Sequence, residues 1–117
     1  MTQATNSIDE PEWVSKTIIR EAFNRGQFFE RAERGELRRR VADYNTHLNY
    51  RMRRRLGEPK EPKCTRSQMV AYYEPDGNMV ALVHQYKRRD GSIRGRPDPK
   101  VLLFQDRWLA VRQASQT

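Results

Sequence analysis

Three side chains near residue 86 have the types that a metal-independent ribonuclease uses. His84, Tyr86 and Arg88 recur at every second position, and in an extended strand this spacing places them on one face. A base for the 2′-hydroxyl, an acid for the leaving oxygen and a cation for the phosphorane charge would then lie together. Any strand that runs from a core to a rim also ends in polar residues, so catalysis by this set is an alternative hypothesis and not the leading one.

A basic loop follows this set. The stretch KRRDGSIRGRPDPK, residues 87–100, carries six cations: Lys87, Arg88, Arg89, Arg94, Arg96 and Lys100. Gly95 permits a close backbone approach, while Pro97 and Pro99 fix φ and reduce the entropy lost on binding. We therefore expect the loop to dock on a phosphate backbone. The alternative is that it connects two strands and carries cations for solubility.

A second basic segment lies between residues 36 and 55, which hold seven arginines against Glu36 and Asp43. The spacing of its apolar residues predicts an amphipathic helix; they are Leu37, Val41, Tyr44, Leu48, Met52 and Leu56. The face opposite this stripe would carry Arg39, Tyr50, Arg53 and Arg54. Arginines can fork onto phosphates and a tyrosine can stack on a base, so this face is a candidate nucleic-acid contact. The alternative is a solvated charged face.

Helical signals also precede this segment. Asp9 and Glu12, with Pro11 between them, form a capping-box pattern that predicts a helix start. Gly26 marks its end near residue 25, and a shorter helix should extend to Arg34. The stripe of this helical region would include Val14, Ile18, Ala22, Phe29 and Ala32.

The second half of the chain has strand signals. Residues 67–73 and 79–86 are rich in Val, Tyr and Met, and EPDGN between them favours a tight hairpin turn. Apolar residues occupy both parities of residues 79–86, which predicts a central strand. Residues 98–112 fit either a helix that begins at Asp98-Pro99 or a hairpin. The hairpin is preferred, because an isolated two-stranded sheet is marginal and needs further strands.

These elements predict an α+β fold in which an N-terminal helical hairpin of two or three helices packs on a small C-terminal antiparallel sheet of three to four strands. The order of helices followed by antiparallel strands resembles the RelE/ParE-type toxin ribonucleases and gyrase poisons, which place a further strand before their helices. We expect one domain over residues 9–113, with helices over 9–57, a linker over 58–64 and the sheet over 65–113. Residues 1–8 and 114–117 would be flexible ends.

Composition limits the partners. The 117 residues include 23 Lys and Arg against 15 Asp and Glu, a formal charge of +8, which attracts polyanions. No apolar run approaches the roughly 18 residues of a spanning helix, and the N-terminus lacks a signal-peptide pattern, so we expect a cytoplasmic protein without a membrane partner. One cysteine, Cys64, with two distant histidines makes neither a disulfide nor a zinc motif. We therefore expect no metal and no cofactor.

The sequence thus favours a small basic nucleic-acid-binding protein that contacts phosphates through the arginine-rich helix and the basic loop. A toxin-like ribonuclease that uses His84 and Tyr86 is the alternative from the enzyme class. A third hypothesis is an inhibitor or interaction protein that binds an acidic or nucleic-acid-binding protein. The choice between RNA and DNA, any sequence preference and the oligomeric state stay open.

Overall fold

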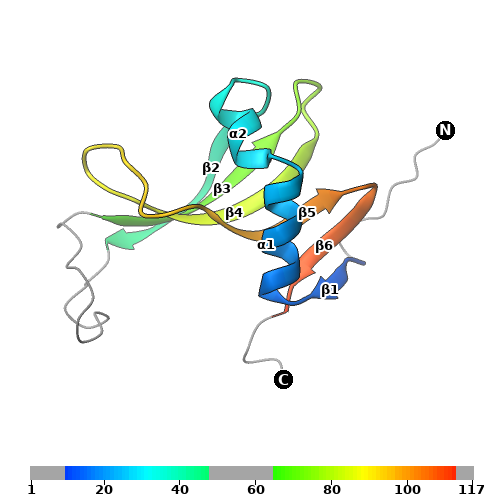
Figure 1. Ribbon diagram of the computed structural model, residues 1–117. Coiled ribbons are helices and arrows are strands. Elements are labelled where there is room, and N and C mark those ends of the chain that lie inside the picture. The colour runs from blue at the N-terminus through cyan, green and yellow to red at the C-terminus, as the bar shows by residue number, and fades with distance from the viewer. Residues whose placement is uncertain (1–9, 48–64, 113–117) are drawn as a thin grey trace.

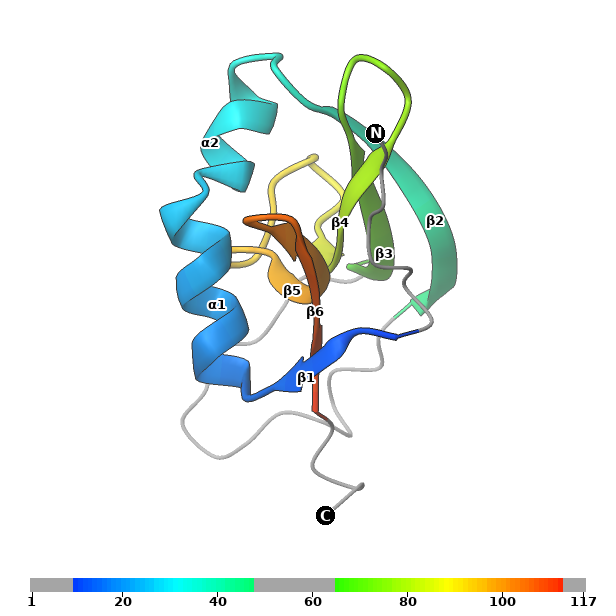
Figure 2. The same cartoon turned by 90° about the vertical axis from the view of Figure 1, so that its right-hand side faces the viewer.

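One six-stranded sheet dominates the protein. The computed structural model describes residues 10–47 and 65–112, and its elements are β1 (Glu12–Val14), α1 (Lys16–Arg25), α2 (Phe28–Glu33), β2 (Arg38–His47), β3 (Arg66–Tyr73), β4 (Met79–Lys87), β5 (Asp98–Phe104) and β6 (Arg107–Val111). The strand order is β1-β6-β5-β4-β3-β2. Strands β2 to β6 form an antiparallel meander, and β1 pairs parallel to β6. Both helices lie on the same side of the sheet (Figures 1 and 2).

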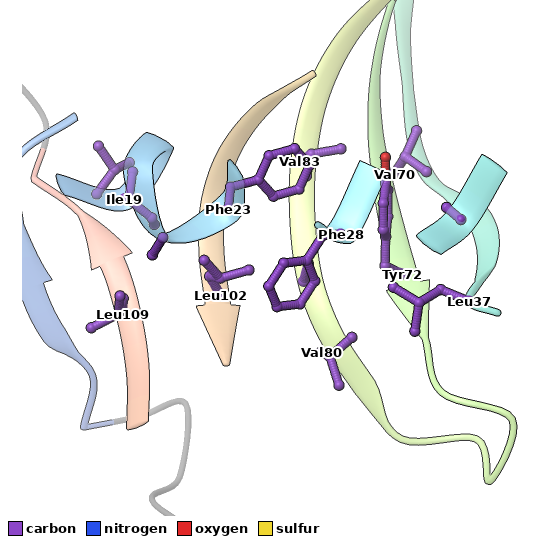
Figure 3. Close-up of a cluster of buried hydrophobic side chains, with 14 of the residues drawn as sticks. Ile19, Phe23, Phe28, Leu37, Val70, Tyr72, Val80, Val83, Leu102 and Leu109 are labelled. Atoms are coloured by element: carbon purple, nitrogen blue, oxygen red, sulfur yellow. The ribbon is translucent and has the colours of Figure 1, made fainter. Parts of the chain in front are cut away.

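The core fills the space between the helices and this side of the sheet, which we call the inner face. Phe23 of α1 stacks on Phe28 of α2 at a ring-centroid distance of 5.7 Å and meets Tyr72 of β3 edge-on at 6.1 Å. Val83 and Leu102 from β4 and β5 are fully buried in the same cluster (Figure 3). Each such side chain contributes about 1.5–3 kcal/mol of hydrophobic free energy on burial, so this cluster fixes the helices on the sheet.

The helices begin and end at identifiable residues. Ser15 caps α1, because its Oγ accepts a hydrogen bond of 3.2 Å from the amide of Ile18. Helix α1 ends at Arg25, and Gly26 follows as its C-terminal cap, as the sequence predicts. Gln27 takes the left-handed conformation, with φ of 55°, and starts α2. The two short helices therefore meet at a sharp junction at Gly26 and Gln27.

The predicted helical hairpin on a small sheet is wrong. Residues 38–47 form strand β2 and not part of an arginine-rich helix, so Arg39 lies on a strand. An extra residue in β2 between Val41 and Asp43 shifts its register against β3, and this β-bulge explains the three-residue spacing that resembled a helix. Tyr50, Arg53, Arg54 and the predicted linker 58–64 lie outside the described residues.

The start of the first helix is also corrected. Residues 12–14 form strand β1, held by β6, and the helix begins only at Lys16. The buried residues of α1 are Ile19, Ala22 and Phe23, whereas Ile18 is 50% exposed. A chain paired with β6 up to Val14 cannot be helical there, so the stripe starts later and is rotated by one residue.

Both predicted hairpins are confirmed. β3 and β4 pair antiparallel around a turn in which the amide of Gly77 donates to the carbonyl of Glu74 at 2.8 Å. β5 and β6 also pair antiparallel, and their turn residues Gln105 and Asp106 have φ of 53° and 65°, which is typical of a two-residue type I′ turn. β4 lies between β3 and β5 and is the central strand that its apolar pattern predicts.

Within the described residues, neither helix has the length and apolar character that crossing a membrane requires.

Candidate nucleic-acid interface

An open groove lies on the inner face where the helices no longer cover the sheet. Its volume is about 340 Å³. The floor comes from β2, β3 and β4, while the end of α2 and the loop after β4, yellow in Figure 1, form its two ends. The lining residues are Glu33, Arg39, Arg40, Val41, Gln68, Val70, Gln85, Lys87, Gly91 and Ile93. We call this feature the inner groove.

Two glutamines form an amide pair on the floor of the inner groove. Gln68 of β3 and Gln85 of β4 are direct partners in the register, and Gln85 Nε2 donates to Gln68 Oε1 at 3.1 Å. Only 4% of Gln68 and 7% of Gln85 is exposed. Gln85 Oε1 is buried without a hydrogen-bond partner among the described residues. Because an unsatisfied buried acceptor is costly, this amide pair is less stable than a fully hydrogen-bonded one.

The cations of β2 and of the basic loop include two groups, and the first group holds the fold together. Arg96 Nη2 donates to Asn24 Oδ1 at 3.1 Å and to Glu30 Oε2 at 3.2 Å, so it ties the basic loop to the helices. Lys100 Nζ lies 3.1 Å from Asp98 Oδ2. Burial raises the pKa of Asp98, but hydrogen bonds from Lys100 and Arg20 outweigh it and hold that pKa below its usual value. These two cations are engaged by internal carboxylates.

Arg39 also belongs to the structural group. Its Nη2 lies 2.7 Å from Glu33 Oε2 at the end of α2. Its guanidinium lies 5.9 Å from the ring centroids of both Phe29 and Tyr72. Burial raises the pKa of Tyr72, so that hydroxyl stays neutral beside Arg39. Arg39 therefore clamps α2 to β2 at one end of the inner groove.

The second group consists of exposed cations without such partners. Arg38, Arg40, Lys87 and Arg89 are exposed and form no ion pair with any residue that the structure describes. Arg40 and Lys87 line the two ends of the inner groove, and Arg38 and Arg89 lie close to them in the chain. We call these four residues the unpaired cations. Their charges face solvent, where a phosphate can reach them.

The loop after β4 is a short hairpin, which gives Lys87 and Arg89 a defined position. The amide of Arg88 donates to the carbonyl of Ser92 at 2.8 Å. The amide of Arg94 donates to the carbonyl of Tyr86 at 3.0 Å. Asp90 Oδ1 accepts from the amide and the hydroxyl of Ser92 at 2.9 and 2.7 Å, and these bonds lower the pKa of Asp90. The guanidinium of Arg94 lies 5.9 Å from the ring centroid of Tyr86. The loop is thus preorganised by its own contacts.

The candidate catalytic residues lie on the other side of the sheet. The rings of His84 and Tyr86 meet edge-on at 4.8 Å, as their spacing predicts, and His84 Nε2 lies 2.5 Å from Ser67 Oγ. Since side chains alternate along a strand, His84 and Tyr86 face away from the inner groove that Gln85 and Lys87 line. Burial lowers the pKa of His84, and the charge of Lys100 lowers it further while Asp98 opposes this. Burial and Lys100 therefore favour the neutral form of His84.

The sequence reasoning missed the amide pair. Gln68 and Gln85 share the inward-facing positions of β3 and β4 with Val70 and Val83, so their burial follows once the register is known. The register itself depends on the turn at residues 74–78. A polar residue at an inward position of each of two paired strands is the signal that could have identified them.

Comparison with known proteins leaves this site without a precedent: no protein-family model, no curated protein and no solved structure matches the chain. The resemblance in element order to the toxin ribonucleases therefore gains no support.

Proposed function

We propose that this protein binds nucleic acid, with phosphates contacting the unpaired cations around the inner groove. The observation that carries the proposal is that Lys87, on the inner face of β4, and Arg40, on the edge strand β2, both line one open groove and have no ion pair in the described part of the chain. Other cations, such as Arg96 and Lys100, are already neutralised by carboxylates of the fold. Arg40 and Lys87 therefore offer a phosphate chain two contacts along this groove.

Phosphate contact predicts how the binding affinity depends on salt concentration. Each phosphate that a cation neutralises releases condensed counterions, so the affinity falls with salt by a slope of about 0.9 per contact on duplex DNA and about 0.7 on single strands. Selectivity among sequences should be modest if phosphates dominate. We expect binding at low salt that weakens steeply between about 50 and 200 mM salt.

The test is fluorescence anisotropy with labelled single-stranded RNA, single-stranded DNA and duplex DNA over a range of salt concentrations. The double variant Arg40→Ala/Lys87→Ala should bind more weakly and with a log–log slope shallower by about 1.4–1.8, because two contacts are lost. Lys16→Ala is the matched control. Lys16 is an exposed cation at the start of α1, away from the inner groove, and its removal should change the slope little.

A denaturing gel of each sample separates the competing functions. Intact probe with a steep salt slope supports the binding function. Shortened RNA that persists in the double variant and disappears in His84→Ala would favour the ribonuclease hypothesis. Absence of binding to all three probes at low salt would contradict the proposal and leave an acidic protein partner as the remaining hypothesis.

A further inference from the structure

We infer that a second pocket, between α1 and the segment that leads into β5, binds the phosphate group of a phosphomonoester. Its volume is about 310 Å³. The lining residues are Arg20, Phe23, Asn24, Arg96, Pro97, Asp98 and Pro99. We call it the arginine pocket. It shares no lining residue with the inner groove, so the two sites can be tested separately.

Two segments that are far apart in the chain bring the polar groups of the arginine pocket together. Arg20 and Asn24 are four residues apart on α1, so their side chains lie on one face of the helix. Arg96 comes from the segment before β5, and its Nη2 donates to Asn24 Oδ1 at 3.1 Å. Glu30 of α2 accepts a second bond from the same Nη2 at 3.2 Å. Arg96 is therefore held in a fixed position opposite α1.

The wall formed by residues 97–99 is rigid and orients the other arginine. Pro97 and Pro99 are both buried, and their rings fix φ on either side of Asp98. Asp98 Oδ1 accepts from Arg20 Nε at 3.2 Å, and its Oδ2 accepts from Lys100 Nζ at 3.1 Å. Both oxygens of this carboxylate are thus engaged by cations. The pocket is preorganised, which lowers the entropy lost when a ligand binds.

The polar groups that the arginine pocket leaves unengaged are donors. Arg20 uses only Nε, and Arg96 uses only Nη2, in hydrogen bonds with the described residues. Because a guanidinium can only donate, the bond from Arg96 fixes the oxygen of Asn24 toward Arg96. Nδ2 of Asn24 is then left for a ligand. The side chains of Arg20 and Arg96 are 54% and 47% exposed, so their remaining N–H groups are accessible.

Charge and donor geometry favour a phosphate group. Arg20, Arg96 and Lys100 supply three positive charges around the pocket, while the carboxylates that pair with them, Asp98 and Glu30, supply two negative charges. A guanidinium binds carboxylate or phosphate through charge-assisted hydrogen bonds. Here the donors come from two opposing walls, and the three free oxygens of a phosphomonoester point in different directions, whereas the acceptors of a carboxylate lie in one plane. A phosphomonoester is also close to a dianion at neutral pH.

The first test is a titration of the labelled full chain with inorganic phosphate at constant ionic strength and neutral pH, followed by 1H–15N NMR. The side-chain amide signal of Asn24 and the Nε–H signal of Arg96 should shift and saturate at millimolar phosphate. Shifts confined to Arg40 and Lys87 would overturn the inference and would support phosphate contact at the inner groove. Shifts that do not saturate would also overturn it.

Asn24→Asp is the decisive variant, because it keeps the oxygen that accepts from Arg96 and replaces the free donor by a negatively charged acceptor. It should weaken phosphate binding at least about tenfold, measured by the Arg96 signal, with thermal unfolding close to wild type. Gln105→Glu is the matched control, since it makes the same amide-to-carboxylate change at an exposed turn position outside the pocket. It should bind phosphate like the wild type. Equal affinity in Asn24→Asp and wild type would overturn the inference.

A second variant tests the guanidinium. Arg20→Lys keeps a cation for Asp98 but loses the free N–H groups of the fork. It should weaken phosphate binding by about threefold to tenfold. Unchanged binding in this variant would contradict a role of Arg20 in holding the phosphate.

Two phosphomonoesters distinguish the sources of the phosphate group. Glycerol 3-phosphate represents a small metabolite, and a short single-stranded DNA with a 5′-phosphate, compared with the same strand without it, represents a nucleic-acid end. The compound that shifts the Asn24 signal at the lower concentration identifies the source, and either result supports the inference. Absence of a shift with both compounds and with inorganic phosphate would overturn it, whatever the salt titrations of the inner groove show.

Discussion

The consecutive arginines Arg38 and Arg39 on β2 have different structural roles. Arg39 pairs with Tyr72 in the register and clamps α2 through Glu33, while Arg38 pairs with Tyr73 and therefore faces the other side of the sheet. Arg38 is exposed and has no ion pair in the described part of the chain. The residue type alone predicts a positive charge, but only the strand register decides whether that charge is structural or available.

This difference predicts the effect of two single substitutions on stability. Arg39→Ala removes the ion pair with Glu33 and the cation–π contacts with Phe29 and Tyr72. Because the pair is partly exposed, these contacts together should contribute about 1–2 kcal/mol. Arg38→Ala should change the free energy of unfolding by less than about 0.5 kcal/mol. Urea unfolding of the two variants checks this, and equal losses would show that Arg39 does not clamp α2.

Among the predicted site residues, Lys87 at the end of β4 and Arg89 in the following loop are exposed, but Arg96 and Lys100 are engaged within the fold. Composition cannot separate these groups, since the partners Glu30 and Asp98 are placed by the packing of α2 and β5. The Gln68–Gln85 amide pair could not be predicted for the same reason. It depends on the burial of both side chains and on the pairing of β3 with β4, and no local sequence pattern gives these.

At the scale of elements, the turn residues correctly predict the hairpins, whereas the spacing of apolar residues wrongly predicts a helix. The β3–β4 and β5–β6 hairpins follow from residues within their turns. The segment from Leu37 to Tyr44 has apolar residues at spacings of four and three, and this spacing wrongly predicts a helix. In β2, Val41 and Tyr44 lie opposite Val70 and Gln68, which are two residues apart, because the bulge absorbs one residue. A bulged strand can therefore imitate a helical stripe.

The position of β1 in the sheet could not be predicted from the sequence, for another reason. β1 pairs with β6 from the far end of the chain, with Glu12 opposite Leu109 and Val14 opposite Val111. Nothing local in three residues indicates a strand, and the capping pattern before them favours a helix instead. Such a short edge strand exists only because β6 offers it hydrogen bonds.

The α1–α2 junction predicts a coupling between two residues. A Cβ at position 26 would lie 2.8 Å from Cδ1 of Phe28, whose ring is buried and stacked on Phe23. Gly26→Ala should therefore displace this ring and destabilise the fold by about 1–3 kcal/mol. Phe28→Val removes both ring atoms that clash, Cδ1 and Cε1. In a double-mutant cycle measured by urea unfolding, the double variant should be more stable than the sum of the two single losses predicts, by about 1 kcal/mol. Strict additivity would contradict the steric explanation.

For the whole molecule, the charge is distributed unevenly. Eight cations lie on β2, β3, β4 and the loop up to residue 94, where the sequence has only two acidic residues, Asp43 and Asp90. These cations are Arg38, Arg39, Arg40, Arg66, Lys87, Arg88, Arg89 and Arg94. On the side of α1 and β6, cations such as Arg20 and Arg107 lie in ion pairs with Asp98 and Glu12. The excess of positive charge is therefore concentrated on strands β2 to β4 and on the loop that follows them.

Concentrated like charge should make stability depend on salt in the absence of any ligand. Screening relieves the repulsion among the unpaired cations, while the ion pairs of the fold weaken equally in wild type and variants. The melting temperature of Arg40→Ala/Lys87→Ala should therefore rise less with salt, between about 20 and 300 mM, than that of the wild type. Lys16→Ala should follow the wild type, because Lys16 lies apart from the cluster. Differential scanning fluorimetry measures the three slopes. Parallel slopes would mean that Arg40 and Lys87 are not repelled by the neighbouring cations, and this would remove the electrostatic basis for placing a phosphate chain there.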